Sequence, residues 1–286
     1  MRLKKIAGIV ASCFLAGALL TGCGGGGGDT AKPQKEQTIK IGMIKYLNAS
    51  EQKVDEILKK VEEKSGVKLN THETIFYDNL NMMQMGLDSG SVQEISTYKC
   101  VGNYFVAHDP KYRMLKDHSL KMQDFFCFAV RRNDTELLNS LNKALGEMKQ
   151  DGTLEKLTGE YITDIKDVEN PPAVEIQHFD GAETIKVAVT GDLPPLDFIS
   201  AKDGAPSGFN TAILSEISKR LQKNIEMIPI DSAARAAALT SHQVDVIFWA
   251  ILPIGDDRPS DIDSPEGVNL SEPYFSDEVV HLDKGK

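Results

Sequence analysis

One arginine is conspicuous because alanines surround it. The segment SAARAAAL, residues 232–239, contains Arg235 as its only charged side chain. A guanidinium group can hold a carboxylate through two parallel hydrogen bonds, so Arg235 is a candidate anchor for an anionic ligand. An arginine that forms a salt bridge on the surface fits these residues equally well. The pattern therefore leaves a binding role and a structural role open.

The residue types that perform hydrolysis or bind metals form no comparable pattern. The six histidines are scattered through segments that we interpret as loops and chain ends, without a paired nucleophile. The four cysteines form no CxxC or CxxH spacing, so no metal site is predicted. We expect a protein that is not an enzyme and has no cofactor, and we keep an enzyme on the same scaffold as an alternative.

The elements that would position these side chains alternate between strands and helices. Strands are predicted at residues 38–45, 67–77, 92–98, 125–130, 185–190, 225–230 and 244–249. Helices are predicted at residues 51–64, 78–87, 100–107, 134–162 with a break at Gly152, 210–221 and 232–240. Asp78, Asn210 and Ser232 are expected to cap three of the helices. This alternation predicts an α/β fold with mostly parallel sheets flanked by helices.

The first 37 residues are interpreted as a targeting segment and a tether. Residues 1–22 combine a basic start with a short apolar stretch, which predicts a signal peptide. They lead into LTGC, which resembles the lipobox of bacterial lipoproteins and implies lipidation of Cys23. An ordinary signal peptide with a chance cysteine is the alternative. Residues 23–37 contain five consecutive glycines but no Gly-Lys-Ser/Thr, so we predict a flexible tether rather than a phosphate loop.

The net charge and the remaining cysteines limit the partners and crosslinks. Loss of residues 1–22, with their three basic side chains, changes the formal charge from −10 to −13. This acidity argues against nucleic acid as a partner and against an electrostatic attachment to anionic lipid. Cys100 and Cys127 stay in the globular part, where they form either a disulfide or two buried thiols.

Two halves of the chain, residues 38–162 and 184–286, echo each other. Leu87-x-Ser89-x-x-Val92-x-x-Ile95 matches Leu239-x-Ser241-x-x-Val244-x-x-Ile247, and TIKI at residue 38 matches TIKV at residue 184. The acidic segment 163–183 between them contains two adjacent prolines and no helical period, so we predict an extended linker. The echoes predict two lobes of one architecture.

Several motifs resemble family 3 extracellular solute-binding proteins. The motifs Gly204-x-x-x-Gly208-Phe209-Asn210, Leu239-x-Ser241-x-x-Val244-Asp245 and Ser271-Glu272-Pro273-Tyr274 are similar to the first lobe of that family. FCFAVRRNDTELLNSLNKALGEMKQDGTLEKLTGEYI is similar to its closing strand and C-terminal helices. The resemblance covers most of residues 38–286 and implies a two-lobed periplasmic-binding-protein-like fold with a ligand cleft between the lobes.

The order of the two halves departs from that family. The half that resembles the family's second lobe and C-terminal helices, residues 38–162, precedes the half that resembles its first lobe, residues 184–286. We expect a circular permutation, with the linker 163–183 joining the end of the C-terminal helices to the start of the first lobe. Two truncated copies are the alternative.

The resemblance implies a receptor for an ABC importer. Such a protein would bind a small polar ligand, an amino acid or a related compound, and would dock onto an ABC permease. Its lipid would anchor it to the cell membrane on the extracytoplasmic side. A ligand-sensing or surface-interaction lipoprotein without a transport role is the alternative.

The candidate ligand-binding residues follow strands or begin helices. Plain helix capping for Asn210 and a core position for Trp249 are the structural alternatives. Amino-acid receptors of that family hold the ligand carboxylate with a Thr-x-x-Arg segment. Here the threonine is absent and the spacing of Arg258 is shifted, and Tyr98 stands where the family has its amino-binding aspartate. The candidates are Asp192, Leu193, Asn210, Arg235 and Trp249 from one half, and Tyr46, Asn48, Ser50 and Tyr98 from the other.

Overall fold

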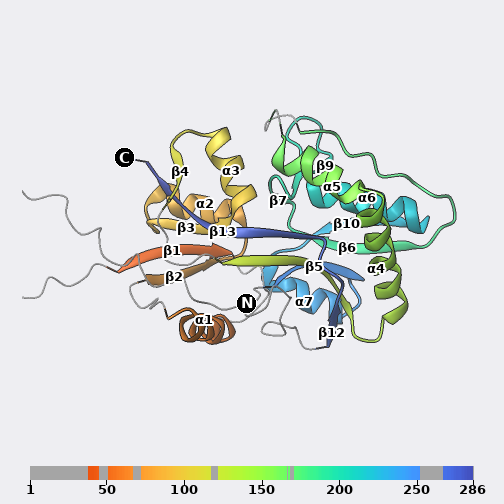
Figure 1. Cartoon of the computed structure of the whole chain (residues 1–286), viewed down its shortest axis with the longest axis horizontal. Helices are drawn as coiled ribbons and strands as arrows, with labels where there is room; N and C mark the ends of the chain where they lie inside the picture. The colour runs from red at the N-terminus through yellow and green to blue at the C-terminus, as the bar shows by residue number, and fades with distance from the viewer. Residues whose placement is uncertain are drawn as a thin grey trace, which may run out of the picture. The chain divides into compact units, whose positions relative to one another are not determined.

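A ten-stranded mixed sheet organises the part of the chain that the computed structural model describes, residues 38–44, 51–66, 72–116, 122–165, 167, 171–251 and 267–285. The strand order is β10-β6-β11-β5-β13-β3-β1-β2, with β12 beside β5 and β4 beside β13. Helices lie on both sides of these strands (Figure 1). The predicted α/β class is therefore confirmed.

One group of elements, which we call lobe A, comprises residues 39–114 together with residues 279–284. Its strands β1, β2 and β3 are parallel, as predicted. Figure 1 shows α2 and α3 on one side of these strands and α1 on the other. The elements are β1 (Ile39–Ile44), α1 (Glu51–Ser65), β2 (His72–Tyr77), α2 (Leu80–Ser89), β3 (Glu94–Tyr98), α3 (Lys99–His108) and β4 (Tyr112–Met114).

A second group, lobe B, comprises residues 125–251 and 267–275. Its strands β6, β10 and β11 are parallel, whereas β5 and β12 are antiparallel to their neighbours. The elements are β5 (Gln123–Arg131), α4 (Thr135–Gln150), α5 (Thr153–Thr158), η1 (Gly159–Thr163), β6 (Thr184–Val189), α6 (Phe209–Leu221), β10 (Asn224–Pro229), α7 (Ser232–Thr240), β11 (Val246–Ile251) and β12 (Val268–Leu270). Segment 191–209, between the predicted strand 185–190 and the predicted helix 210–221, contains a small antiparallel sheet of β7 (Asp192–Leu193), β8 (Asp197–Ile199) and β9 (Pro206–Ser207).

Alternation along the strands of lobe B divides its core into two layers. Successive side chains of a strand point to opposite faces. On β11, Phe248 therefore belongs to the large apolar cluster that contains the buried residues of α4, α5 and α6. Trp249, the next residue, belongs to a smaller cluster with Ala238 and Leu239 of α7. A strand buried on both faces reads as a continuous apolar run, and VIFWAI is such a run.

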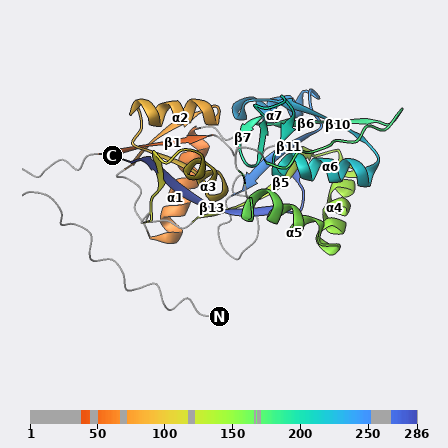
Figure 2. The ribbon, with the colours of Figure 1, turned by 90° about the horizontal axis from the view of Figure 1, so that it is seen from above.

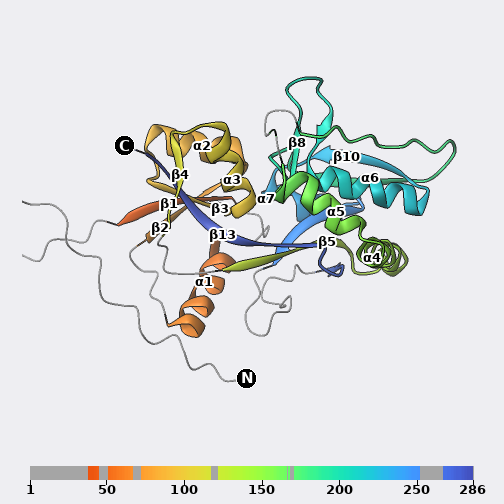
Figure 3. The same cartoon turned by 45° about the horizontal axis from the view of Figure 1, so that its top comes forward.

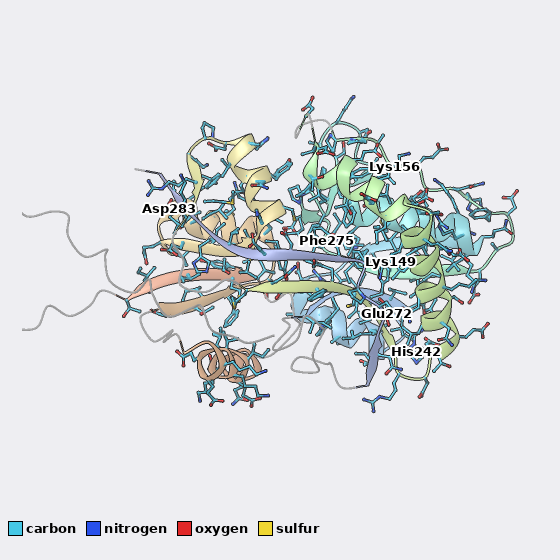
Figure 4. The ribbon with its side chains drawn as sticks, in the orientation of Figure 1. Lys149, Lys156, His242, Glu272, Phe275 and Asp283 are labelled. Carbon is cyan, nitrogen blue, oxygen red and sulfur yellow. The ribbon has the colours of Figure 1, made fainter. Side chains whose placement is uncertain are left out.

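The chain passes between the lobes twice. It enters lobe B through β5 and returns to lobe A through β13 (Phe275–Lys284), which starts beside β5 and ends beside β3 and β4. Figure 4 labels Phe275 and Asp283 toward the two ends of this strand. No strand was predicted for residues 275–284. We call residues 122–124 and 276–278 the crossing segments.

The predicted repeat is present in the backbone. Gly90 N bonds to Leu87 O at 3.1 Å, and His242 N bonds to Leu239 O at 3.2 Å. Both Gly90 and His242 have positive φ, 77° and 61°. Each lobe therefore contains the same helix end, left-handed turn and strand start, in the register that the sequence echo predicts.

The segment between the halves is extended and held along lobe B. Ala173 forms a β-bridge to Ser207, and Ser215 Oγ donates to Glu175 O at 2.6 Å. Phe179 N donates to Asn224 Oδ1 at 2.9 Å. The described residues of segment 163–183 thus pass along β9, α6 and the start of β10, in the segment that was predicted as a linker.

Candidate functional site

The carboxyl ends of parallel strands from the two lobes are joined by hydrogen bonds. In α/β proteins, ligands bind beyond the carboxyl ends of such strands, so this place is the candidate site. The bonds run from Ser232 Oγ to Asp78 O (2.9 Å), from Asn79 Nδ2 to Asp231 Oδ1 (3.5 Å) and from Asn81 N to Asp192 Oδ2 (3.1 Å). We call these six residues, together with Arg235, the junction. Figure 2 shows the elements that carry them, α2, β7 and α7, near one another in the upper part of the view.

The start of α2 supplies the lobe A side of the junction. Asn79 occupies the N-cap position, and its Oδ1 accepts a hydrogen bond from Met82 N at 3.0 Å. The prediction that Asp78 caps this helix is therefore wrong by one residue. Asp78 instead offers its main-chain carbonyl to Ser232 of lobe B. The amide of Asn81, left without an intrahelical acceptor in the first turn, points to Asp192.

Asp192 places a carboxylate at the positive end of α2. Its Oδ2 accepts the bond from Asn81 N, and anions are stabilised at a helix N-terminus. Burial raises the pKa of Asp192 and is the largest influence on it, and the charge of Asp197 adds to this rise. The Asn81 amide and the Arg235 guanidinium oppose the rise in pKa.

A buried aspartate shapes the loop that carries Asp192. Asp197 Oδ1 accepts hydrogen bonds from Thr190 N at 2.7 Å and Gly191 N at 2.8 Å, as well as from the Thr190 hydroxyl. Its Oδ2 accepts from Asn210 Nδ2 at 2.7 Å. Because Asp197 is 3% exposed, these donors replace the water that would otherwise solvate its charge. These hydrogen bonds to Asp197 fix the conformation of the loop after β6, which carries Asp192.

Asn210 lies beneath that loop and not at a helix cap. The N-cap position of α6 belongs to Gly208, so the predicted capping by Asn210 is wrong. A side chain on Gly208 would lie 2.5 Å from Leu196 O, which explains the glycine. The amide of Asn210 is buried and bonds to Asp197 and to the Tyr274 hydroxyl, at 3.1 Å for the latter. Its contact with a ligand stays a prediction.

The start of α7 supplies the opposite side of the junction. Asp231 is at the N-cap position, so the predicted cap, Ser232, is instead the first helical residue. Arg235 is 3% exposed, and its Nε donates to Ile230 O at 3.0 Å. It is therefore a buried arginine rather than a surface one. This position agrees with an anchoring role, which the structure does not test.

Three further candidates are buried away from the surface. Leu193 is part of the large core cluster. Trp249 is 2% exposed, and its Nε1 has no hydrogen-bond partner among the described residues. The hydroxyl of Tyr98 donates to Asp124 Oδ2 at 2.9 Å. Ligand binding by Leu193, Trp249 and Tyr98 stays a prediction.

Several predicted features lie outside the described residues. Tyr46, Asn48, Ser50, Arg258 and the lipidation candidate Cys23 belong to this group. Within the described ranges, Cys100 and Cys127 are both buried and free, so the disulfide alternative is contradicted. The same ranges contain no cluster of acidic, histidine and cysteine side chains suited to a metal ion. They also contain no helix with the length and apolar character needed to cross a membrane.

Sequence reasoning missed Asn79, Asn81 and Asp231, although the repeat could have located two of them. The register that relates Leu87 to Leu239 also relates Asn79 to Asp231, and both residues occupy N-cap positions. The repeat therefore brings equivalent helix starts together at the junction.

Comparison with protein families gives one match. The model described as "Bacterial extracellular solute-binding proteins, family 3" matches residues 52–164 and 185–286. These ranges comprise more than half of the chain. A comparison with curated protein sequences gave no match.

Solved structures with a similar arrangement have low sequence identity. The ligand-binding component of an ABC-type import system from Staphylococcus aureus, with zinc bound, is 11% identical at a TM-score of 0.44, over 87% of this chain and 66% of that one. A nutrient-binding protein from Burkholderia cenocepacia bound to methionine is 13% identical at 0.39, over 86% and 84%. A periplasmic substrate-binding protein of an ABC transporter from Coxiella burnetii has the same four values.

Proposed function

This chain belongs to family 3 of the bacterial extracellular solute-binding proteins, and we propose that it binds a small polar ligand at the junction as the receptor of an ABC importer. The observation that supports this site is the meeting of strand ends from both lobes around Asp192 and Arg235. The ligand is an amino acid or a related compound, because helix starts and a guanidinium suit a carboxylate.

The junction implies a competition between the ligand and the protein's own carboxylate. In this structure the Asp192 carboxylate accepts the hydrogen bond of the Asn81 amide, and the charge of Arg235 acts on the same carboxylate. A ligand carboxylate that reached the junction would exchange with Asp192 for one or both of these groups. We expect the lobes to separate for ligand entry and to close on the ligand, with motion about the crossing segments.

Membrane attachment follows from the N-terminal segment. We propose that the signal peptide is removed before Cys23, and that lipid on this cysteine anchors the protein on the extracytoplasmic side of the membrane. The mature chain would then comprise residues 23–286. For solution experiments we use this mature chain with Cys23→Ser.

Lobe order is the structural part of the proposal. We propose a circular permutation, in which the family's order begins at residue 184 in lobe B, and β13 then leads into lobe A. The pairing of the terminal strands supports it, because Glu94 of β3 pairs with Ile41 on one side and with Asp283 on the other. Two strand spacings separate those residues, which is about 10 Å. Chain ends this close permit such a rearrangement.

The lobe order has its own test. A gene that begins at residue 171, runs to residue 286, continues through about six Gly and Ser residues and ends with residues 38–165 restores the expected order. We expect a folded protein with one cooperative unfolding transition. A control that joins the same pieces without the Gly and Ser residues shows whether the link is strained. Failure of the linked protein to fold contradicts the permutation.

Ligand binding is tested by thermal unfolding against amino acids, short peptides and other small metabolites. A ligand at 100 times its Kd stabilises the native state by about 2.7 kcal/mol. We expect one compound to raise the unfolding temperature, and Arg235→Ala to abolish the effect. The matched control is Arg113→Ala, which removes an exposed ion pair of lobe A at 2.6 Å from Asp283 and should leave the effect unchanged. No response from any compound favours the surface-interaction alternative.

A further inference from the structure

Two aspartates face each other where the chain crosses between the lobes. Asp124 of β5 and Asp277 of β13 are directly paired in the antiparallel register. The Cβ atoms of such a pair are about 4.5–5.5 Å apart, and like charges at this position destabilise a sheet. Strand β13 continues from this pair into a lobe on either side (Figure 3), and β5 continues from it into lobe B. The pair therefore lies at the place about which the lobes would move.

Asp124 is the less well solvated member of the pair. Asp124 is only 7% exposed. Oδ2 accepts the Tyr98 hydroxyl at 2.9 Å, but Oδ1 is buried and has no hydrogen-bond partner among the described residues. Burial, with a smaller effect from the charge of Asp277, raises the pKa of Asp124 to about 6 against the opposing effect of the Tyr98 hydroxyl.

Asp277 has the partners that an anion needs. Its Oδ2 accepts from Cys100 N at 2.8 Å, in the first turn of α3, and its Oδ1 accepts from Glu278 N at 2.8 Å. Burial raises the pKa of Asp277, and the two amides together with the Lys99 charge oppose that rise. A single proton shared by the pair therefore belongs on Asp124, next to a charged Asp277.

The other charged or titratable groups around the pair leave Asp124 without a cation. From β13, Glu278 forms an ion pair with Lys99 at 2.8 Å, and both side chains are about half exposed. From β3 and α3, Tyr98 supplies a hydroxyl, and burial raises the pKa of the Cys100 thiol well above its ordinary range. Asp124 forms no ion pair with any described residue. A buried carboxylate in this position is stabilised by taking up a proton.

We propose that Asp124 is a proton-binding site whose occupancy sets the geometry of the crossing between the lobes. When the proton is on Oδ1, the neutral carboxyl group does not repel the Asp277 carboxylate, and β5 stays paired with β13. When the proton leaves, the two carboxylates repel and Oδ1 requires water. The crossing then opens and the junction loosens. The inference rests on the proposed lobe motion but not on any particular ligand.

The distance between the lobes, measured without ligand, tests the inference. Spin labels on Ala107→Cys of α3 and Gln150→Cys of α4, both exposed positions, report this distance in the mature chain by double electron–electron resonance. The native Cys100 and Cys127 are buried and do not compete for the label. We expect a longer and broader distance distribution as the pH rises, with a midpoint near 6.

Two variants separate a proton switch from a structural effect. Asp124→Asn keeps the shape and removes the charge that repels Asp277, so we expect the acidic distribution at every pH. Glu278→Gln removes the neighbouring charge that pairs with Lys99, and we expect the wild-type midpoint. A wild-type distribution that does not change between about pH 4.5 and 8, or an unchanged response in Asp124→Asn, overturns the proposal. Ligand binding that persists in either case leaves the proposed function intact.

Discussion

Gly90 and His242 occupy the same left-handed backbone position in the two copies of one helix–turn–strand unit. Their φ angles are 77° and 61°. His242, labelled in Figure 4, follows the end of α7 in the chain. Lobe A has a glycine here, which adopts positive φ without steric strain. Lobe B has a histidine, whose Cβ atom makes the left-handed conformation less favourable by roughly 1–2 kcal/mol.

We expect His242→Gly to raise the free energy of unfolding by about 0.5–1 kcal/mol, since the strain is relieved but the unfolded chain gains freedom. His242 is exposed, so little packing is lost. The matched change Gly90→Ala should lower stability by about 1 kcal/mol, because nothing lies within 4 Å of the added methyl group and only the backbone opposes it. Urea unfolding measures both. Equal effects of the same sign contradict the equivalence.

Asp197 organises the loop that presents Asp192. Replacing it with alanine leaves the amides of Thr190 and Gly191 and the Asn210 side chain without their acceptor. Each unpaired buried group costs about 1–3 kcal/mol, so we expect Asp197→Ala to destabilise by about 3 kcal/mol or more. The control Asp203→Ala changes an exposed carboxylate of the neighbouring turn and should cost much less. Comparable losses in urea unfolding contradict the role of Asp197.

Stability should depend on pH through Asp124. Its pKa rises from 3.8 to about 6 on folding because the carboxyl group is buried, so the folded state binds the proton more tightly. The resulting stabilisation is present below about pH 4 and is lost as the pH rises to about 6, by roughly 2–3 kcal/mol. Asp124→Asn should therefore gain stability relative to the wild type over this range. Parallel pH profiles from thermal unfolding would rule this out.

The two buried thiols should be unreactive in the folded protein. Burial raises the pKa of Cys127 to about 12 and that of Cys100 well above its ordinary value, so little thiolate is present at neutral pH. In the mature chain, we expect a thiol reagent to modify two cysteines only after denaturation. Mass spectrometry after oxidation should show no disulfide. Modification at the rate of a free thiol in native buffer contradicts this placement.

Local sequence patterns predicted most elements. The helical period from residue 134 to residue 162 with a break at Gly152 corresponds to α4 and α5, and Gly152 adopts a φ of 79°. The strand patterns work for the same reason, since period and turn chemistry are properties of neighbouring residues. The predicted N-caps of α2 and α7 were wrong by one residue. Either of two adjacent polar residues can cap a helix, and the choice depends on which of them bonds to another element. Ser232, for example, bonds to Asp78 of the other lobe.

The candidate site was only partly predictable. The sequence identified Asp192 and Arg235 from a turn and from an alanine-rich helix. It did not identify Asn81, because a main-chain amide has no signature in the side chains. It also suggested Trp249 and Leu193, whose apolar side chains are equally suited to the core in which the structure places them.

The sequence by itself determined the alternation of strands and helices, the repeat, the apolar faces and the acidic balance, since each depends on the type and spacing of nearby residues. Only the tertiary structure decided that β13 leaves lobe B, passes β5 and closes lobe A. That pairing sets Asp124 opposite Asp277, two carboxylates that are far apart in the chain. Strand order and register depend on how whole faces are buried against each other, and no local pattern specifies them.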